Sequence, residues 1–186
     1  MPARIMCLVI VILEARGLFL SIGDRRWKVF AFYTQLSNIA TAVSAIFVLV
    51  FGETHYTILL RYLSSCMLLM TFFVTTCILI PMGGDPKRLL FSGNGLYHHL
   101  IIPVVSVGSY LLIERRVQSA TAILVPTVLT FLYGIIMLWV NYKDIFDGPY
   151  PFFRVKNQSV TATVLWMTAL TAAIGLLSLA IYRISI

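Results

Sequence analysis

Charged residues are scarce in this chain of 186 residues, where they make up 11% of the sequence against 60% for hydrophobic residues. Ordinary soluble domains carry about 25% charged residues. The composition therefore excludes an ordinary soluble domain and predicts a protein that crosses the membrane several times. The net charge of +7 does not indicate a nucleic-acid partner, because the basic residues stand in short clusters between apolar runs, as in loops that flank membrane spans.

Cysteine is equally scarce, and Cys7, Cys66 and Cys77 lie in apolar runs without any close-spaced pair. This pattern indicates small buried hydrophobic side chains and gives no sign of a disulfide framework or a zinc site. The N-terminus lacks a cleavage site of the Ala-x-Ala kind, and Glu14 and Arg16 interrupt its apolar run. We therefore interpret it as a retained first span and not as a signal peptide.

Six apolar segments are long enough to cross a bilayer, which takes roughly 20 helical residues. Their approximate limits are 5–22, 30–51, 57–81, 96–113, 120–141 and 160–182. Hydrocarbon offers no partner for unpaired amide groups, so each span is expected to be a helix. We predict an all-α integral membrane protein in which residues 1–186 form a single transmembrane domain, a bundle of six helices with short loops.

The second span opens with polar residues that lipid solubility does not require. Thr34, Ser37, Asn38 and Thr41 recur every three or four residues, so they share one helix face. Hydroxyls in membrane helices commonly bond to a carbonyl or to a neighbouring helix, which is the structural interpretation. In the functional interpretation, Thr34 is a buried nucleophile, and Asn38 or Ser37 helps to stabilise an oxyanion.

His98 and His99 begin the fourth span, on the same membrane face as Thr34. A neutral imidazole is the usual base for a hydroxyl nucleophile. Neighbouring helical positions point about 100° apart, so we expect only one of the two rings to face the bundle interior. His55 is predicted on the opposite membrane face, so no metal site is expected, and the sequence suggests no cofactor.

Two further features of the sequence have both a structural and a functional interpretation. Glu14 is near the middle of the first span, where a lone carboxylate is costly. It is expected to pair with an arginine of another span or to be protonated, and a role in carrying protons or orienting a histidine stays open. In the fifth loop, Tyr150 lies between two prolines and Phe152 follows the second of them. It is either an interfacial aromatic belt or a re-entrant cap over a lipid-shaped pocket.

Three segments together resemble a known family. They are Phe-Tyr-Thr-Gln-Leu-Ser-Asn (32–38), His-His-Leu-Ile-Ile-Pro (98–103) and Gly-Pro-Tyr-Pro-Phe-Phe (148–153). In their order and spacing the chain resembles, from Phe30 to about Tyr182, the androgen-induced and androgen-dependent multipass membrane proteins, and more closely their bacterial relatives. The resemblance implies a threonine hydrolase of esters between fatty acids and hydroxy fatty acids, here in a bacterial plasma membrane.

The resemblance places the nucleophile on Thr34. A histidine four residues before the proline, the bacterial pattern, selects His99, whereas the eukaryotic pattern selects His98. Thr34 is followed here by Gln-Leu-Ser-Asn and not by the acidic residue of the eukaryotic proteins. The resemblance therefore supports the pair of threonine nucleophile and histidine base more directly than it supports the substrate class.

The leading prediction is an intramembrane hydrolase of lipid esters with Thr34 as nucleophile and His99, or His98, as base. Its expected partner is a membrane lipid or fatty-acid ester, with no nucleic acid and no metal. The residues expected to contact the substrate or the oxyanion are Asn38, Ser37, Tyr150 and Phe152. The alternatives are a small proton-coupled transporter or lipid-binding protein that uses Glu14 and the histidines, and a structural subunit whose polar stripe only packs helices.

Overall fold

The computed structural model describes residues 1–115, 119–145 and 150–184, and every regular element within them is helical. Six helical segments are long and apolar enough to cross a membrane, which confirms the predicted all-α bundle and makes the chain a multipass membrane protein. These segments are Pro2–Gly23, Tyr33–Phe51, His55–Leu79, Gly93–Leu112, Ala120–Tyr142 and Val160–Ile184.

The individual elements follow these spans closely. The helices are α1 (Pro2–Arg25), α2 (Tyr33–Phe51), α3 (His55–Val74), α4 (Pro86–Leu90), α5 (Gly93–Gly95), α6 (Ile102–Leu112), α7 (Leu124–Tyr142) and α8 (Val160–Ile184). Two wide π-helical turns, Thr75–Leu79 and Leu96–Ile101, extend α3 and precede α6. Short 3₁₀ turns cover Arg26–Ala31, Ala120–Ile123, Pro151–Phe153 and Val155–Asn157.

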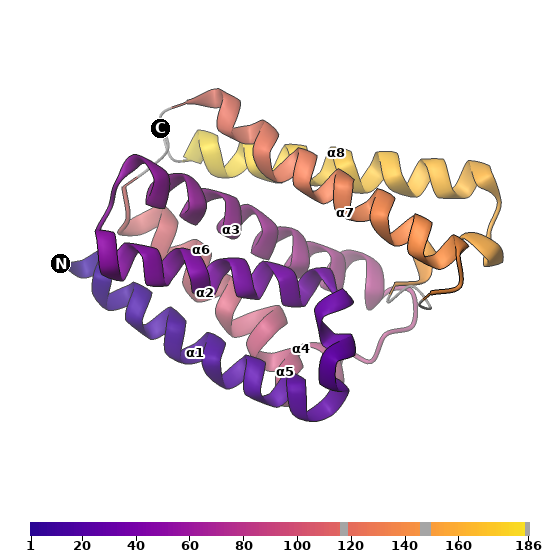
Figure 1. Ribbon diagram of the computed structural model, residues 1–186, viewed down its shortest axis with the longest axis horizontal. Helices are drawn as coiled ribbons and strands as arrows, with labels where there is room; N and C mark the ends of the chain where they lie inside the picture. Colours follow the sequence, from indigo (N-terminus) through magenta and orange to yellow (C-terminus); the bar gives the residue numbers. More distant parts are fainter. Residues whose placement is uncertain (116–118, 146–149, 185–186) are drawn as a thin grey trace.

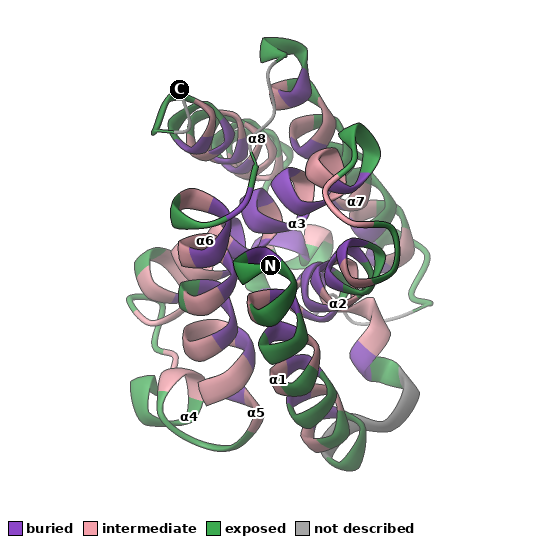
Figure 2. Cartoon of the chain, turned by 90° about the vertical axis from the view of Figure 1, so that its left-hand side faces the viewer, coloured by how far each residue is buried: buried purple, intermediate pink, exposed green. Residues whose placement is uncertain are grey.

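Helix α3 lies at the centre of the bundle, where it packs against α2, α6, α7 and α8. Figure 2 shows the other long helices arranged around it. Helix α1 completes the bundle by packing against α2 and α6, while α7 and α8 pair with each other on the far side of α3 (Figure 1). The bundle thus has two parts that meet at α3.

The two parts differ in the polarity of their interiors. Between α3, α7 and α8 the buried side chains are mostly aromatic and aliphatic, and they include Tyr62, Leu170 and Ile174. Between α1, α2, α3 and α6 many buried side chains are polar, because hydroxyl, amide and charged groups hydrogen-bond across the helices. Large apolar side chains on the outer faces of α7 and α8 are exposed, as the bilayer requires.

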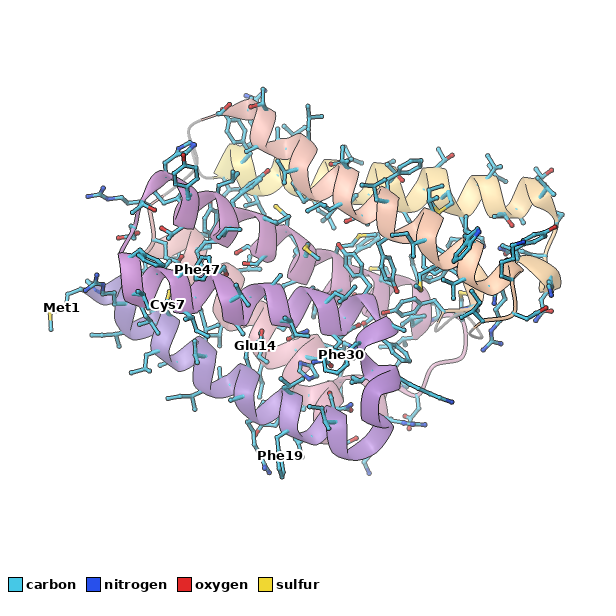
Figure 3. The ribbon with its side chains drawn as sticks, in the orientation of Figure 1. Met1, Cys7, Glu14, Phe19, Phe30 and Phe47 are labelled. Atoms are coloured by element: carbon cyan, nitrogen blue, oxygen red, sulfur yellow. The ribbon has the colours of Figure 1, made fainter. Side chains whose placement is uncertain are left out.

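Helix α1 contacts the bundle through a single stripe. The buried positions Ala3, Cys7, Ile10, Glu14, Gly17 and Ser21 recur at alternating steps of four and three residues. That spacing keeps one face of a helix against its neighbours. Figure 3 shows Glu14 about midway along this stripe, between the ribbons of α1 and α2. The polar members Glu14 and Ser21 therefore face the polar part of the interior.

A buried ion pair closes the end of the bundle where α3 begins. Arg61 donates through Nε and Nη2 to the two carboxylate oxygens of Glu114, both at 2.8 Å. The same guanidinium donates to the hydroxyl of Ser106 at 3.1 Å, and Ser109 donates to Glu114 at 2.7 Å. We expected Glu14 either to pair with an arginine of another span or to be protonated. Arg61 pairs with Glu114, and Glu14 has no ion pair within the described residues.

Candidate active site

Thr34 is the second residue of α2, and this position sets its hydroxyl apart. Ser37, Thr41 and Ser44 each donate to a carbonyl three or four residues earlier. Such bonds use the hydroxyl within the helix itself. Because α2 begins at Tyr33 after the extended residue Phe32, no earlier turn of α2 offers a carbonyl to the Thr34 hydroxyl. Its Oγ1 lies 3.2 Å from the hydroxyl of Tyr150, and its backbone N–H donates to the same Tyr150 oxygen at 3.3 Å.

The neighbours of Thr34 on the polar stripe support its backbone. Ser37 and Asn38 both donate to the carbonyl of Thr34, at 2.8 Å and 2.6 Å. Ser37 also bonds to the Thr71 hydroxyl on α3 at 2.9 Å. The predicted stripe is thus divided, because Ser37 and Asn38 fix the first turn of α2 while the Thr34 hydroxyl points elsewhere. Neither Ser37 nor Asn38 borders the cavities at Thr34.

The two histidines lie in the π-helical turn before α6. The N–H of Ile102 donates to the carbonyl of Tyr97, five residues earlier. Pro103 causes this widening, since it has no N–H to give the carbonyl of His99. A wider turn reduces the angle between successive side chains. Both rings consequently border the same cavity, although an ordinary helix led us to expect only one to face the interior.

Helix α1 holds the buried ring of His98. Its Nε2 lies 2.9 Å from the hydroxyl of Ser21, which also accepts from the amide of Asn94 at 3.3 Å. The ring lies directly against Gly17, where a Cβ atom would come within 2.7 Å of Cε1. Glycine is therefore required at this point of the α1 stripe for His98 to occupy its position.

His99 is oriented by a backbone carbonyl. Its Nδ1 lies 2.8 Å from the carbonyl oxygen of Leu89 in α4. A carbonyl only accepts, so in the neutral ring Nδ1 carries the proton and Nε2 carries the basic lone pair. Gly95 lets α4 approach this closely, since a Cβ there would lie 2.4 Å from the carbonyl oxygen of Arg88. The Leu89 carbonyl of α4 thus fixes the tautomer and the orientation of the His99 ring.

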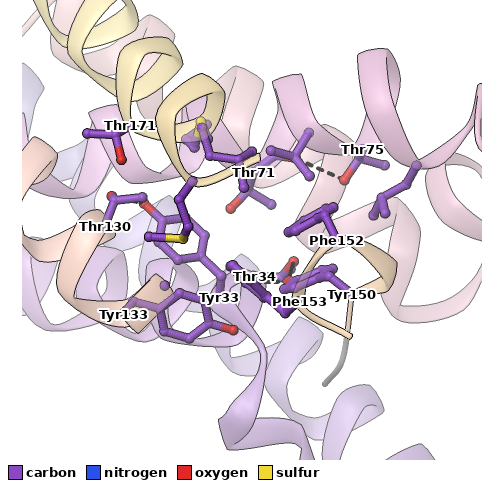
Figure 4. Close-up of a pocket in the computed structure, with 16 residues that line it drawn as sticks. Tyr33, Thr34, Thr71, Thr75, Thr130, Tyr133, Tyr150, Phe152, Phe153 and Thr171 are labelled. Atoms are coloured by element: carbon purple, nitrogen blue, oxygen red, sulfur yellow. Dashed lines mark hydrogen bonds between the residues drawn. The ribbon is translucent and has the colours of Figure 1, made fainter. Parts of the chain in front are cut away.

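Two cavities meet at Thr34. The polar cavity has a volume of about 160 Å³, and its border includes Thr34, Gln35, Arg88, Asn94, His98 and His99. The apolar cavity, of about 40 Å³, extends from Thr34 between α3, α7 and α8 (Figure 4). The hydroxyls of Thr71, Thr75 and Thr130 at its border are bonded to other groups, to Ser37, to a helix carbonyl and to Tyr33. Thr34, Leu79 and Tyr150 border both cavities.

No protein-family model, curated protein or solved structure matches this chain. The family resemblance of the three segments therefore stays a prediction.

The aromatic segment 150–153 packs into the bundle beside Thr34. Tyr150, Phe152 and Phe153 are all buried, and the rings of Tyr150 and Phe152 are stacked with centroids 5.2 Å apart. Gln158 donates to the carbonyl of Phe152 at 3.0 Å and fixes the turn. Buried rings fit a cap over a cavity better than a belt facing lipid headgroups. The neighbouring Gly148 and Pro149 of the resemblance lie outside the described residues.

Several residues of the site had no role in the sequence-based prediction. Ser21 follows Glu14 by seven residues on the α1 stripe, a spacing from which it could have been found. Gln35 is buried, borders the polar cavity and has an amide nitrogen without a partner in the described part of the chain. The carbonyl of Leu89 leaves no sequence signal, because any residue type supplies one. Glu14 borders neither cavity.

Proposed function

We propose that the protein is an intramembrane hydrolase of lipid esters, with Thr34 as the nucleophile and His99 as the general base. The observation that carries the proposal is the position of the Thr34 hydroxyl, at the border between a polar cavity with two histidines and an apolar cavity. A lipid ester has the same order of polarity, with an apolar acyl chain, a carbonyl and a more polar alcohol portion.

In the proposed reaction, Thr34 Oγ1 attacks the ester carbonyl carbon and its proton passes to His99 Nε2. The tetrahedral intermediate collapses as the C–O bond to the alcohol breaks, and the alkoxide takes the proton from His99. Water then attacks the acyl-threonine, again with His99 as base, and releases the carboxylic acid and the free hydroxyl. The carbonyl of Leu89 keeps the proton on Nδ1, so that Nε2 can accept at each step.

The oxyanion of the intermediate needs donors beside Thr34. The two proposed donors are the backbone N–H of Thr34 and the hydroxyl of Tyr150. In the structure this N–H donates to the Tyr150 oxygen at 3.3 Å, so both groups lie at the same point. Both lie at the N-terminus of α2, where the helix dipole favours negative charge. Ser37 and Asn38 support this arrangement indirectly, since they hold the Thr34 carbonyl and with it the first turn.

The polarity of the cavities and the family resemblance support the proposed substrate class. Fatty-acyl esters, including those of hydroxy fatty acids, are the proposed substrates, and a bacterial plasma membrane is the proposed location. No metal or cofactor has a part in the proposed steps.

The test compares ester turnover and fluorophosphonate labelling of the purified protein in detergent. Thr34→Ala should abolish both, whereas Thr41→Ala, the matched loss of a hydroxyl bonded within the same helix, should retain both. His99→Gln should reduce turnover by about 10²-fold or more, the usual contribution of a general base. His98→Gln separates the two histidines, since a larger loss there would transfer the base to His98. Equal labelling of wild type and Thr34→Ala would overturn the proposal.

A second candidate function, a proton-coupled transporter, is favoured by one observation. Glu14 is buried at mid-span, and one of its carboxyl oxygens has no hydrogen-bond partner within the described residues. Buried carboxyls of this kind occur on proton pathways. A transporter predicts that Glu14→Gln abolishes substrate-driven proton uptake into liposomes while Thr34→Ala leaves it intact. If the protein is a hydrolase, Thr34→Ala should lower ester turnover more than Glu14→Gln does.

A further inference from the structure

A groove on the lipid-facing side of the bundle runs between α7 and α8. It has a volume of about 600 Å³ and is bordered by side chains of both helices, among them Phe131, Ile135, Leu138 and Val164. Phe131, Ile135 and Val164 are exposed, and none of the groove's bordering residues in the described part of the chain is charged. An apolar hollow in this position is occupied by hydrocarbon when the protein is in a bilayer.

The groove and the apolar cavity at Thr34 share part of their border. Met167 and Thr171, both on α8, border the groove on one side and the cavity on the other. Figure 4 shows Thr171 across the cavity from Thr34 and Tyr150. From the lipid-facing side inward, the order in space is therefore the groove, the apolar cavity, Thr34 and the polar cavity.

Met167 is seated against a glycine of the opposite helix. A Cβ atom at Gly134 of α7 would lie 2.7 Å from Met167 Cε and 2.8 Å from its Sδ. The end of the Met167 side chain thus fills the space that the side chain of any larger residue at position 134 would need. Methionine is unbranched and has three rotatable bonds, so it can leave such a place at small cost.

We propose that the groove between α7 and α8 is a lateral entry site through which one acyl chain of a bilayer lipid reaches Thr34, and that Met167 is the side chain that moves to admit it. The occupant is an acyl chain because the groove faces the bilayer, is apolar and adjoins an apolar cavity across Met167 and Thr171. The entry site rests on the proposed function for its direction toward Thr34, but its occupancy can be measured without hydrolysis.

The turnover of esters with long acyl chains should then depend on Met167 more strongly than the turnover of esters with short ones. A butyrate ester can react at Thr34 without entering the groove, whereas a palmitate ester has to extend past Met167. Met167→Trp should lower kcat/KM for palmitate by about tenfold or more and change that for butyrate by less than about twofold. Met167→Ala should act in the opposite direction and raise kcat/KM for palmitate relative to butyrate. Leu165→Trp is the matched control, because Leu165 is exposed on α8 and borders neither space.

Binding is measured separately in the Thr34→Ala background. A diazirine-labelled palmitic acid in detergent micelles should crosslink to the peptide containing Phe153, which borders the apolar cavity. Unlabelled palmitic acid should compete, Met167→Trp should remove the crosslink, and Leu165→Trp should retain it. Crosslinking that no competitor reduces would overturn the entry site.

The two readouts distinguish the entry site from the hydrolase. Saturable crosslinking that depends on Met167, without ester turnover by wild type, would refute the hydrolase and support the entry site. Turnover that Met167→Trp and Leu165→Trp leave with the same chain-length preference would refute the entry site and support the hydrolase. Should Met167→Trp fail to fold, Met167→Ala decides, since an unchanged ratio of palmitate to butyrate turnover would contradict the proposal.

Discussion

Replacing Tyr150 by phenylalanine tests whether its hydroxyl takes part in catalysis. The substitution removes one oxygen and leaves the ring in place, because the ring stacks on Phe152 at 5.2 Å and contacts Phe153 edge-on at 6.1 Å. The lost contacts include those to Thr34, at 3.2 Å and 3.3 Å. Hydrogen bonds between neutral groups contribute about 1 kcal/mol each to stability. Because these two bonds are long, the free energy of unfolding should fall by about 1 kcal/mol in total.

The expected effect on catalysis is larger than this loss of stability. Removal of one oxyanion donor lowers kcat by about 10²–10³-fold, which corresponds to about 2.7–4 kcal/mol. A hydroxyl that only packs the loop would change turnover by a few fold at most. Steady-state turnover of a palmitate ester and thermal unfolding, both in the same detergent, therefore separate the two roles.

Tyr133→Phe is the matched control for this experiment. The Tyr133 hydroxyl donates to the carbonyl of Ala31 at 2.8 Å, a shorter bond than either made by Tyr150, and its ring borders only the apolar cavity. Tyr133→Phe should therefore cost more stability than Tyr150→Phe while leaving kcat within about threefold of wild type. If Tyr150→Phe also stays within that range, Tyr150 does not stabilise the oxyanion and the assignment is wrong.

Two further predictions concern positions away from Thr34. Gly17→Ala places a Cβ 2.7 Å from Cε1 of His98, so the ring has to move, and ester turnover should fall by about tenfold or more. Gly108→Ala, with no atom within 4 Å of the added Cβ, should leave turnover unchanged, and equal turnover of both variants would show that the position of His98 is unimportant. Arg61→Ala should lower the free energy of unfolding by about 3–5 kcal/mol, because it leaves the Glu114 carboxylate buried and unpaired. The double variant Arg61→Met, Glu114→Leu should recover most of that loss in thermal unfolding, and a double variant as unstable as the single one would contradict this.

The fold could be predicted from hydropathy because the bilayer leaves few alternatives. A long apolar segment has to be helical when no water is present to satisfy its backbone. The ends of the helices were harder to predict. The second span was expected from residue 30, but Arg26–Ala31 form a 3₁₀ turn and α2 begins at Tyr33. Apolar residues such as Val29 and Phe30 suit a turn buried against the bundle as well as a helix.

The candidate site could be predicted in part, because residue type and topology carry some of the information. The number of spans places Thr34, the histidines and the aromatic segment at one end of the bundle, and all of them border the cavities there. The orientation of side chains depends on finer geometry. The π turn lets both histidines border one cavity, and the Leu89 carbonyl that orients His99 depends on the distance between two backbone segments.

The polar stripe of α2 shows why structural and functional interpretations of a membrane helix need not compete. Ser37 and Asn38 use their donors on the carbonyl of Thr34, which is a structural role. That role fixes the first turn of the helix, where no earlier turn of α2 offers a carbonyl to a hydroxyl. The Thr34 hydroxyl is consequently directed to Tyr150, at the border of the two cavities. A packing stripe that ends at a helix N-terminus thus leaves its first hydroxyl outside the bonds of the helix, which is why the proposed nucleophile is Thr34 and not Ser37 or Thr41.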